Sequence, residues 1–272
     1  MNAPGLLPAD THIHTALCQH AEGMPVDYAK AAVERGIPEI TITDHIPAPD
    51  GYDASSRMPL QDFPAYLDAV AAAARAFPGR VRLGIEADYY PGCEAYLHRV
   101  LDSAPFDLVL GSVHFIGDWG FDNPVNLHRW READLRTVWS RYLDLIRGLV
   151  AMKSFDAITH FDLPKKFGHR LPDEELTGLV SPVLDVIAGA GLPMEVNTGG
   201  RRKPVGEIYP SLSILKLMRE RGIPILFGSD AHLPSEVGHA FEEAVQLVRR
   251  AGYTHYVRFR ARHAVPEALP GA

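Results

Sequence analysis

Short apolar runs rich in β-branched residues alternate along the chain with longer segments whose apolar residues recur at helical spacing. The short runs predict strands at about residues 6–14, 40–43, 81–85, 107–113, 157–159, 193–198 and 223–227. The longer segments predict helices at about residues 26–35, 62–77, 93–103, 133–152, 174–189, 211–221 and 236–250. Residues 253–259 predict a short additional strand.

The predicted elements form seven strand-plus-helix units with no break in composition between them. Strands that alternate with helices are typical of a parallel sheet, and so many units without a linker favour its closure into a (β/α) barrel. Barrels of this length are commonly one domain. We therefore expect an α/β fold with a single domain over residues 1–272 and a core at about residues 6–250.

The composition, with 46% hydrophobic and 22% charged residues, is typical of a soluble protein with enough apolar material for a core. The formal net charge of −7, with no basic run beyond Arg201-Arg202-Lys203, argues against a nucleic-acid partner. Two cysteines predict no disulfide framework. No stretch reaches the roughly 18–20 apolar residues of a membrane span, and no signal-peptide pattern is seen. We expect a cytoplasmic protein without a membrane partner, and the sequence predicts no particular oligomeric state.

Two histidines lie on one face of the first predicted strand. Residues i and i+2 of a strand point the same way, so His12 and His14 project together. The following loop adds a third imidazole, from His20. Neutral imidazole is the commonest nitrogen ligand of transition metals, and this grouping therefore indicates half of a metal site.

Every predicted strand ends in histidine, aspartate or glutamate. The strand ends and the loops next to them carry His12, His14, His20, Asp44, His45, Glu86, His114, His160, Glu195, Asp230 and His232. In a (β/α) barrel these ends converge on one face, where active sites lie. The set is too large for one four-coordinate ion, and it suits two or three divalent ions that share a carboxylate. Nitrogen and oxygen donors without thiolate favour zinc, manganese or iron.

Several motifs carry a family resemblance: Asp10-Thr11-His12-Ile13-His14-Thr15, Cys18-Gln19-His20-Ala21, Thr43-Asp44-His45, Gly84-Ile85-Glu86, Gly111-Ser112-Val113-His114-Phe115 and Gly228-Ser229-Asp230-Ala231-His232. They resemble the polymerase-and-histidinol-phosphatase (PHP) superfamily, over about residues 9–250. The resemblance implies a distorted (β/α)7 barrel with a trinuclear metal centre. The stretches 118–124 and 195–199, with Arg202-Lys203-Pro204, look like those of the monofunctional histidinol-phosphate phosphatases.

The resemblance also implies how the ligands are divided among the ions. The first ion would be held by His12, His14, Glu86 and Asp230. Glu86 would bridge to a second ion, completed by His114 and His160, and a third ion would be held by His20, His45 and His232. Asp44 is not needed as a ligand, so it could orient an imidazole or donate a proton in catalysis, or only cap a turn.

The expected substrate groups lie on the loops beside the cluster. The resemblance places a phosphate-binding arginine at Arg202, and Lys203, Lys165 and Lys166 could reach the same phosphate, with Arg57 a weaker candidate. Glu195 is expected to meet the amino groups of the substrate, with a structural ion pair as the alternative. Trp119, Phe121 and Asp122 offer a flat wall and an acceptor for an imidazole.

These expectations describe a metal-dependent phosphomonoesterase that hydrolyses L-histidinol phosphate to L-histidinol and phosphate, a step of histidine biosynthesis. A phosphatase of another small phosphorylated metabolite is the first alternative. A nuclease is disfavoured by the acidic net charge. A non-catalytic metal-binding PHP module is a third alternative, but such a module is expected to lack several of the ligands that this chain has.

Overall fold

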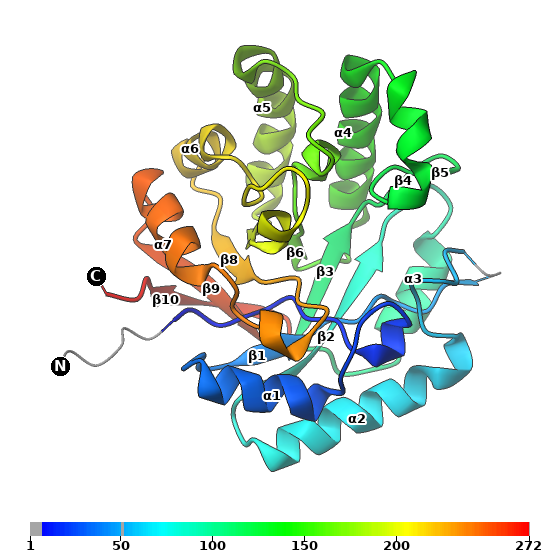
Figure 1. Ribbon diagram of the computed structural model, residues 1–272, viewed down its shortest axis with the longest axis vertical. Helices are drawn as coiled ribbons and strands as arrows, with labels where there is room; N and C mark the ends of the chain where they lie inside the picture. Colours follow the sequence, from blue (N-terminus) through cyan, green and yellow to red (C-terminus); the bar gives the residue numbers. More distant parts are fainter. Residues whose placement is uncertain (1–6, 50–51, 272) are drawn as a thin grey trace.

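A computed structural model describes residues 7–49 and 52–271 of the chain. Its centre is a six-stranded parallel sheet with the order β1-β2-β3-β6-β7-β8. The strands are β1 (Ile40–Ile42), β2 (Val81–Asp88), β3 (Leu108–Ser112), β6 (Ala157–Ile158), β7 (Met194–Asn197) and β8 (Ile225–Gly228). The sheet is curled, and helices surround it (Figure 1). The predicted α/β fold with a distorted barrel is confirmed.

The first predicted strand is an extended bridging segment in the structure. Asp10 pairs with Ile40 at the start of β1, and Ile13 pairs with Ala231 just after β8, in both cases in parallel. Residues 10–14 therefore lie between the two edge strands of the sheet and close the curl. They form no continuous ladder, because their hydrogen bonds are divided between two neighbours. Leu6, where the prediction began, lies outside the described residues.

Helices follow the strands along the described chain: α1 (Pro25–Glu34), α2 (Phe63–Ala76), α3 (Glu94–Leu101), α4 (Leu135–Met152), α5 (Asp173–Ala190), α6 (Leu212–Glu220) and α7 (Phe241–Arg250). Helix α4 shows why they form. Asp134 precedes it and accepts the backbone N–H of Thr137 at 2.8 Å, and the buried residues of α4 recur at spacings of three and four. Within the described residues, none of the helices could cross a membrane.

Two antiparallel hairpins complete the fold. The first, β4 (Phe115–Ile116) and β5 (Trp119–Gly120), leads into the 3-10 helix η4 (Pro124–Arg131). The second is β9 (His255–Arg260) with β10 (His263–Ala268), where the sequence predicts one strand only. Strand β10 is almost wholly exposed and contains Pro266, so it has no alternating pattern to reveal it. Val257 and Phe259 of β9 pack on Leu108 and Leu110 of β3.

Candidate metal centre

A cavity of about 580 Å³ opens at the carboxyl ends of the strands. Eight of the nine predicted metal ligands line it: His14, His20, His45, Glu86, His114, His160, Asp230 and His232. The ninth, His12, is fully buried, and its Nε2 lies 3.0 Å from Nε2 of His14. The structure therefore brings the whole predicted ligand set together.

Glu86, on β2, lies at the centre of this ligand set. Its Oε2 is 3.4 Å from Nε2 of both His12 and His14. Oδ1 of Asp230, just after β8, is 3.5 Å from Nε2 of His14. Two atoms that bind one zinc ion at roughly 2.0–2.1 Å in a tetrahedral arrangement lie about 3.3 Å apart. These four side chains therefore have the spacing of one coordination sphere.

The other oxygen of Glu86 faces a second pair of imidazoles. Its Oε1 is 3.2 Å from Nε2 of His160 and 3.6 Å from Nε2 of His114. His45 also approaches Glu86, but from the side of the first oxygen, with its Nδ1 2.9 Å from Oε2. The ligand atoms of His45, Glu86 and His114 lie close enough together to share an ion, so the geometry places His45 nearer the bridging carboxylate than the implied division does.

His20 and His232 form the outer edge of the cluster. Nδ1 of His20 lies 2.9 Å from the carbonyl of Cys18, and Nδ1 of His232 lies 2.9 Å from the carbonyl of Asp230. A carbonyl only accepts, so each Nδ1 carries the proton and each Nε2 presents a lone pair. The two Nε2 atoms lie 2.9 Å apart. Two lone pairs that face each other at this distance repel, and a cation between them would remove the repulsion.

The polar groups at the centre of the cluster also fit a bound cation. Oε2 of Glu86 and Nδ1 of His45 are buried 2.9 Å apart, yet neither has a partner in hydrogen-bonding geometry among the described residues. Burial raises the pKa of Glu86, but the His45 and His12 imidazoles outweigh it and hold that pKa well below its usual range. Burial lowers the pKa of His20 to about 4 and holds the pKa of His232 well below its usual value. Anionic carboxylates and neutral imidazoles are the forms that bind metals.

Comparison with known proteins relates this geometry to a family. The family model of the PHP domain matches residues 10–199, and that of the PHP-associated region matches residues 213–245. The chain belongs to the PHP family. A probable histidinol-phosphatase of Deinococcus radiodurans is 46% identical over 259 residues, which cover 94% of this chain and 98% of that protein. The histidinol-phosphatase of Bacillus subtilis is 29% identical, over 86% of this chain and 96% of that protein.

A solved structure has the same fold. The crystal structure of histidinol phosphate phosphatase from Lactococcus lactis, complexed with zinc, L-histidinol and phosphate, superposes with a TM-score of 0.81. The match covers 96% of this chain and 99% of that chain, at 21% sequence identity. This likeness supports the distorted PHP barrel described above.

The imidazoles of this PHP centre are held from behind by two carboxylates. Oε1 of Glu195 lies 2.7 Å from Nδ1 of His12. Oδ1 of Asp88 lies 2.5 Å from Nδ1 of His114. In each case the carboxylate directs the other ring nitrogen, Nε2, toward Glu86. Carboxylates in this position fix the tautomer and raise the basicity of an imidazole ligand.

The Cys18 thiol takes the corresponding position behind His14. Its Sγ lies 3.5 Å from Nδ1 of His14, donates to Oδ1 of Asp44 at 3.1 Å and accepts the backbone N–H of His45 at 3.1 Å. Both oxygens of Asp44 are engaged, because they also accept from the backbone and hydroxyl of Thr15. Asp44 is fully buried and does not line the cavity. This placement favours the turn-capping interpretation of Asp44 over a proton donor.

Four of the side chains expected at the substrate are instead engaged elsewhere: Glu195, Arg57, Arg202 and Lys165. Glu195 is fully buried beside His12. Arg57 is buried in an ion pair with Asp88. Nη2 of Arg202 donates to the carbonyls of residues 229 and 230, and its Nε lies 3.1 Å from Glu236. None of the four lines the cavity, so the structure does not place them where the sequence predicts a phosphate or an amine.

Lys165 shows the physical reason for these differences. Its Nζ is buried 2.8 Å from Oδ2 of Asp162 and 3.1 Å from Oε2 of Glu207. A buried cation must have such partners, and because Lys165 is held by them away from the cavity it is not available to a phosphate there. The next residue, Lys166, lines the cavity and pairs with Asp122 at 2.9 Å, and Lys203 lines the cavity as well.

The walls of the cavity differ from the expected ones. Trp119 and Phe121 do not line it, because both rings pack into the core around Trp130. The flat surfaces come instead from Phe115 and Phe167, with other side chains. Asp122 lines the cavity as expected.

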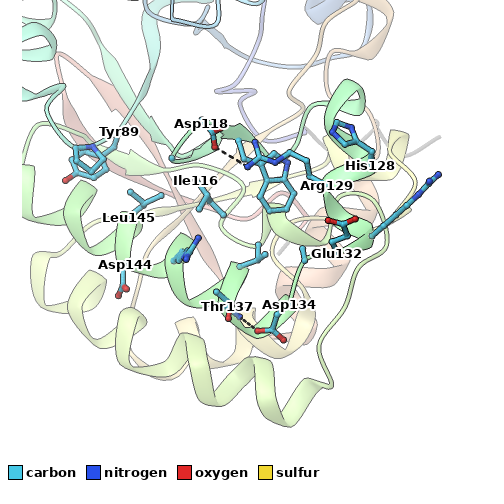
Figure 2. Close-up of a pocket in the computed structure, with 17 residues that line it drawn as sticks. Tyr89, Ile116, Asp118, His128, Arg129, Glu132, Asp134, Thr137, Asp144 and Leu145 are labelled. Atoms are coloured by element: carbon cyan, nitrogen blue, oxygen red, sulfur yellow. Dashed lines mark hydrogen bonds and ion pairs between the residues drawn. The ribbon is translucent and has the colours of Figure 1, made fainter.

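A larger cavity lies outside the cluster. This groove has a volume of about 1130 Å³ and is lined by the β4–β5 hairpin, by residues 128, 129 and 131–133, and by α4. Figure 2 shows the side chains that line it. It contains no predicted metal ligand. Arg129 pairs there with Asp118 at 3.1 Å. Size alone therefore does not identify the functional site of this chain.

Proposed function

We propose that the chain is a metal-dependent phosphomonoesterase that hydrolyses L-histidinol phosphate to L-histidinol and phosphate. The observation that carries this proposal is the relative named as a probable histidinol-phosphatase, which is 46% identical over 94% of the chain. The cavity supports it, because nine candidate ligands, two lysines and flat apolar walls suit a small phosphate ester.

We propose that two to three divalent ions, zinc, manganese or iron, occupy the cluster. Charge supports this number. Glu86, Glu195 and Asp230 have no lysine or arginine partner within residues 7–49 and 52–271, whereas Asp88 pairs with Arg57. Buried charges without partners are costly. One divalent ion would neutralise two of these three charges, and a second is needed for the third.

The side chains of the site would divide the work of hydrolysis. Ions held by the cluster would stabilise the charge that develops on the phosphoryl oxygens. Lys203 and Lys166 would bind the phosphate of the incoming ester at the cavity wall. Glu195 and Asp88 would keep His12 and His114 in the ligating tautomer throughout. The walls of Phe115 and Phe167 would exclude water from the apolar part of the substrate.

The test is a phosphate-release assay on protein that has been stripped with a chelator and reloaded with zinc, manganese or iron. L-Histidinol phosphate is compared with other small metabolite monoesters and with p-nitrophenyl phosphate. We expect the highest kcat/KM on L-histidinol phosphate, two to three ions per chain by elemental analysis, and no activity in the matched Glu86→Gln variant. A faster turnover of another metabolite would favour the alternative phosphatase. Phosphate release that survives excess chelator would overturn the metal-dependent mechanism.

A further inference from the structure

The charged side chains of the cavity wall do not balance one another locally. Lys166 is neutralised by Asp122, at 2.9 Å. Lys203 has no ion pair within the described parts of the chain, so one positive charge remains on its wall. Burial, which acts against its charge, lowers the pKa of Lys203 below 10.5. The cavity thus has an unpaired cation where the loop after β7 reaches it.

A negative charge remains on another wall, in the loop between β1 and α2. Arg57 of this loop is shared by two carboxylates: it contacts Asp88, and its Nε lies 3.6 Å from Oδ2 of Asp53. One guanidinium cannot neutralise both. Asp88 is buried and held by His114, whereas Asp53 lines the cavity. The excess negative charge is therefore presented to the cavity by Asp53.

The Asp53 carboxylate is held in a defined place. Its Oδ2 lies 3.6 Å from Nε of Arg57, and its backbone has a φ of 47°, a left-handed conformation that aspartate adopts more readily than most residues. The neighbouring ring of Tyr52 packs between Tyr90 and Phe115, with centroid distances of 4.6 and 4.8 Å. Phe115 itself lines the cavity. A carboxylate beside a flat ring is a suitable receptor for a compact organic cation.

We propose that Asp53 is a specificity-determining residue that binds the ammonium group of the substrate, while Lys203 and the ions that the cluster would hold bind its phosphate. This inference rests on the proposed function and defines the substrate class as phosphate monoesters of amino alcohols. The other carboxylates near the cavity are less suitable acceptors. Asp122 is paired with Lys166, and Glu195 is buried behind His12. Asp53 is 15% exposed and shares Arg57 with Asp88, with the side chain of Ser56 beside it.

The experiment compares wild type with Asp53→Asn on three esters: L-histidinol phosphate, its analogue without the amino group, and p-nitrophenyl phosphate. Removal of the carboxylate charge leaves the substrate ammonium without its partner. We expect kcat/KM on L-histidinol phosphate to fall by roughly 10- to 100-fold, mainly through KM, and the two esters without the amine to change less than about twofold. Asp118→Asn is the matched control, because Asp118 lies in the separate groove of Figure 2, and it should leave all three rates unchanged.

Asp53→Glu keeps the charge and tests whether folding is at fault. It should retain a preference for the aminated ester over its analogue, and melting curves should show that both variants are folded. An equal loss on all three esters, or no loss on any, would overturn the role of Asp53. If wild type hydrolyses other monoesters but not L-histidinol phosphate, the proposed function fails instead. The role of Asp53 is then tested with O-phosphoethanolamine and ethyl phosphate, which differ by an amino group. If the ratio of kcat/KM on these two esters is the same in Asp53→Asn as in wild type, the inference is overturned.

Discussion

Replacement of Glu195 by glutamine separates a role at the metals from a role at the substrate. Oε1 of Glu195 lies 2.7 Å from Nδ1 of His12, and its Oε2 accepts from the backbone N–H of His160 and from Nδ2 of Asn197, both at 3.0 Å. A carboxylate can accept at both ends, whereas an amide can accept at one end only. Glutamine keeps two of the three hydrogen bonds if its oxygen takes the place of Oε2. Its NH2 group then faces His12.

The consequence of that orientation falls on the metal. Nδ1 of His12 must become an acceptor, so its proton moves to Nε2, the atom that faces Glu86 and His14. A protonated Nε2 cannot bind an ion. The alternative orientation keeps the tautomer but leaves the donors of His160 and Asn197 without an acceptor. Loss of such an orienting partner typically costs about 10- to 100-fold in metal affinity, or roughly 1.4–2.7 kcal/mol.

The assay measures zinc affinity by competition with a chromophoric chelator, and kcat/KM on L-histidinol phosphate and p-nitrophenyl phosphate at limiting and excess zinc. We expect both esters to lose activity equally at limiting zinc and to recover with excess zinc. Glu39→Gln is the matched control. Glu39, which directly precedes β1, is also buried, but it pairs with Arg82 of β2 and not with a metal ligand. It should lower stability without changing zinc affinity. Unchanged zinc affinity in Glu195→Gln, or a larger loss on L-histidinol phosphate alone, would refute the reasoning.

Three further predictions follow from the packing around the site. Lys165→Met leaves buried carboxylates unpaired and should cost roughly 3–5 kcal/mol of unfolding free energy in denaturant titrations. Lys166→Met should mainly raise KM on every ester, because Lys166 lines the cavity. The reverse pattern would contradict the assignment of Lys165 to the fold and Lys166 to the substrate. Cys18→Ala removes the thiol behind the His14 imidazole and should weaken zinc binding about tenfold, whereas Cys93→Ala should lower only Tm. Equal zinc affinities of the two variants would exclude a role of Cys18 in orienting His14. Burial lowers the pKa of Lys203, so its cation is lost as pH rises through a value below 10.5, and KM should increase in that range. Lys203→Arg should move the increase in KM to higher pH, because arginine keeps its charge. A KM that does not change with pH in wild type would contradict a phosphate-binding role of Lys203.

The metal ligands could be predicted because local sequence determines where they lie. Apolar β-branched runs predict the strands, and the alternation with helices makes the sheet parallel. Every strand then ends at the same edge, so a polar residue that follows a run must lie beside the others. His45, Glu86 and His114 illustrate this, since each lies near the end of a different strand or just after it and all three meet in the cavity. No knowledge of side-chain packing is needed for that step.

The substrate groups could not be predicted in the same way, because their partners are chosen by tertiary packing. Lys165 and Lys166 are adjacent and chemically equal, yet one is buried against Asp162 and the other faces the cavity. Arg202 and Lys203 are also adjacent, yet Arg202 donates to backbone carbonyls while Lys203 faces the cavity. A long cationic side chain reaches several places from one backbone position, and buried carboxylates compete for it with the cavity. Only the positions of those carboxylates decide the outcome.

Asp88 is not among the predicted site residues, although the spacing rule that identified His12 and His14 applies to it as well. Glu86 and Asp88 are two residues apart on β2, so their side chains share one face of the strand. Glu86 lies among the imidazoles, and Asp88, one step further along, reaches the back of His114. A carboxylate two positions after a predicted ligand in the same strand is therefore a candidate for holding the next imidazole. The same spacing joins Glu195 to Asn197 on β7, where Nδ2 of Asn197 donates to the carboxylate that orients His12. In both strands the alternation that brings the ligands together also supplies the groups that orient them.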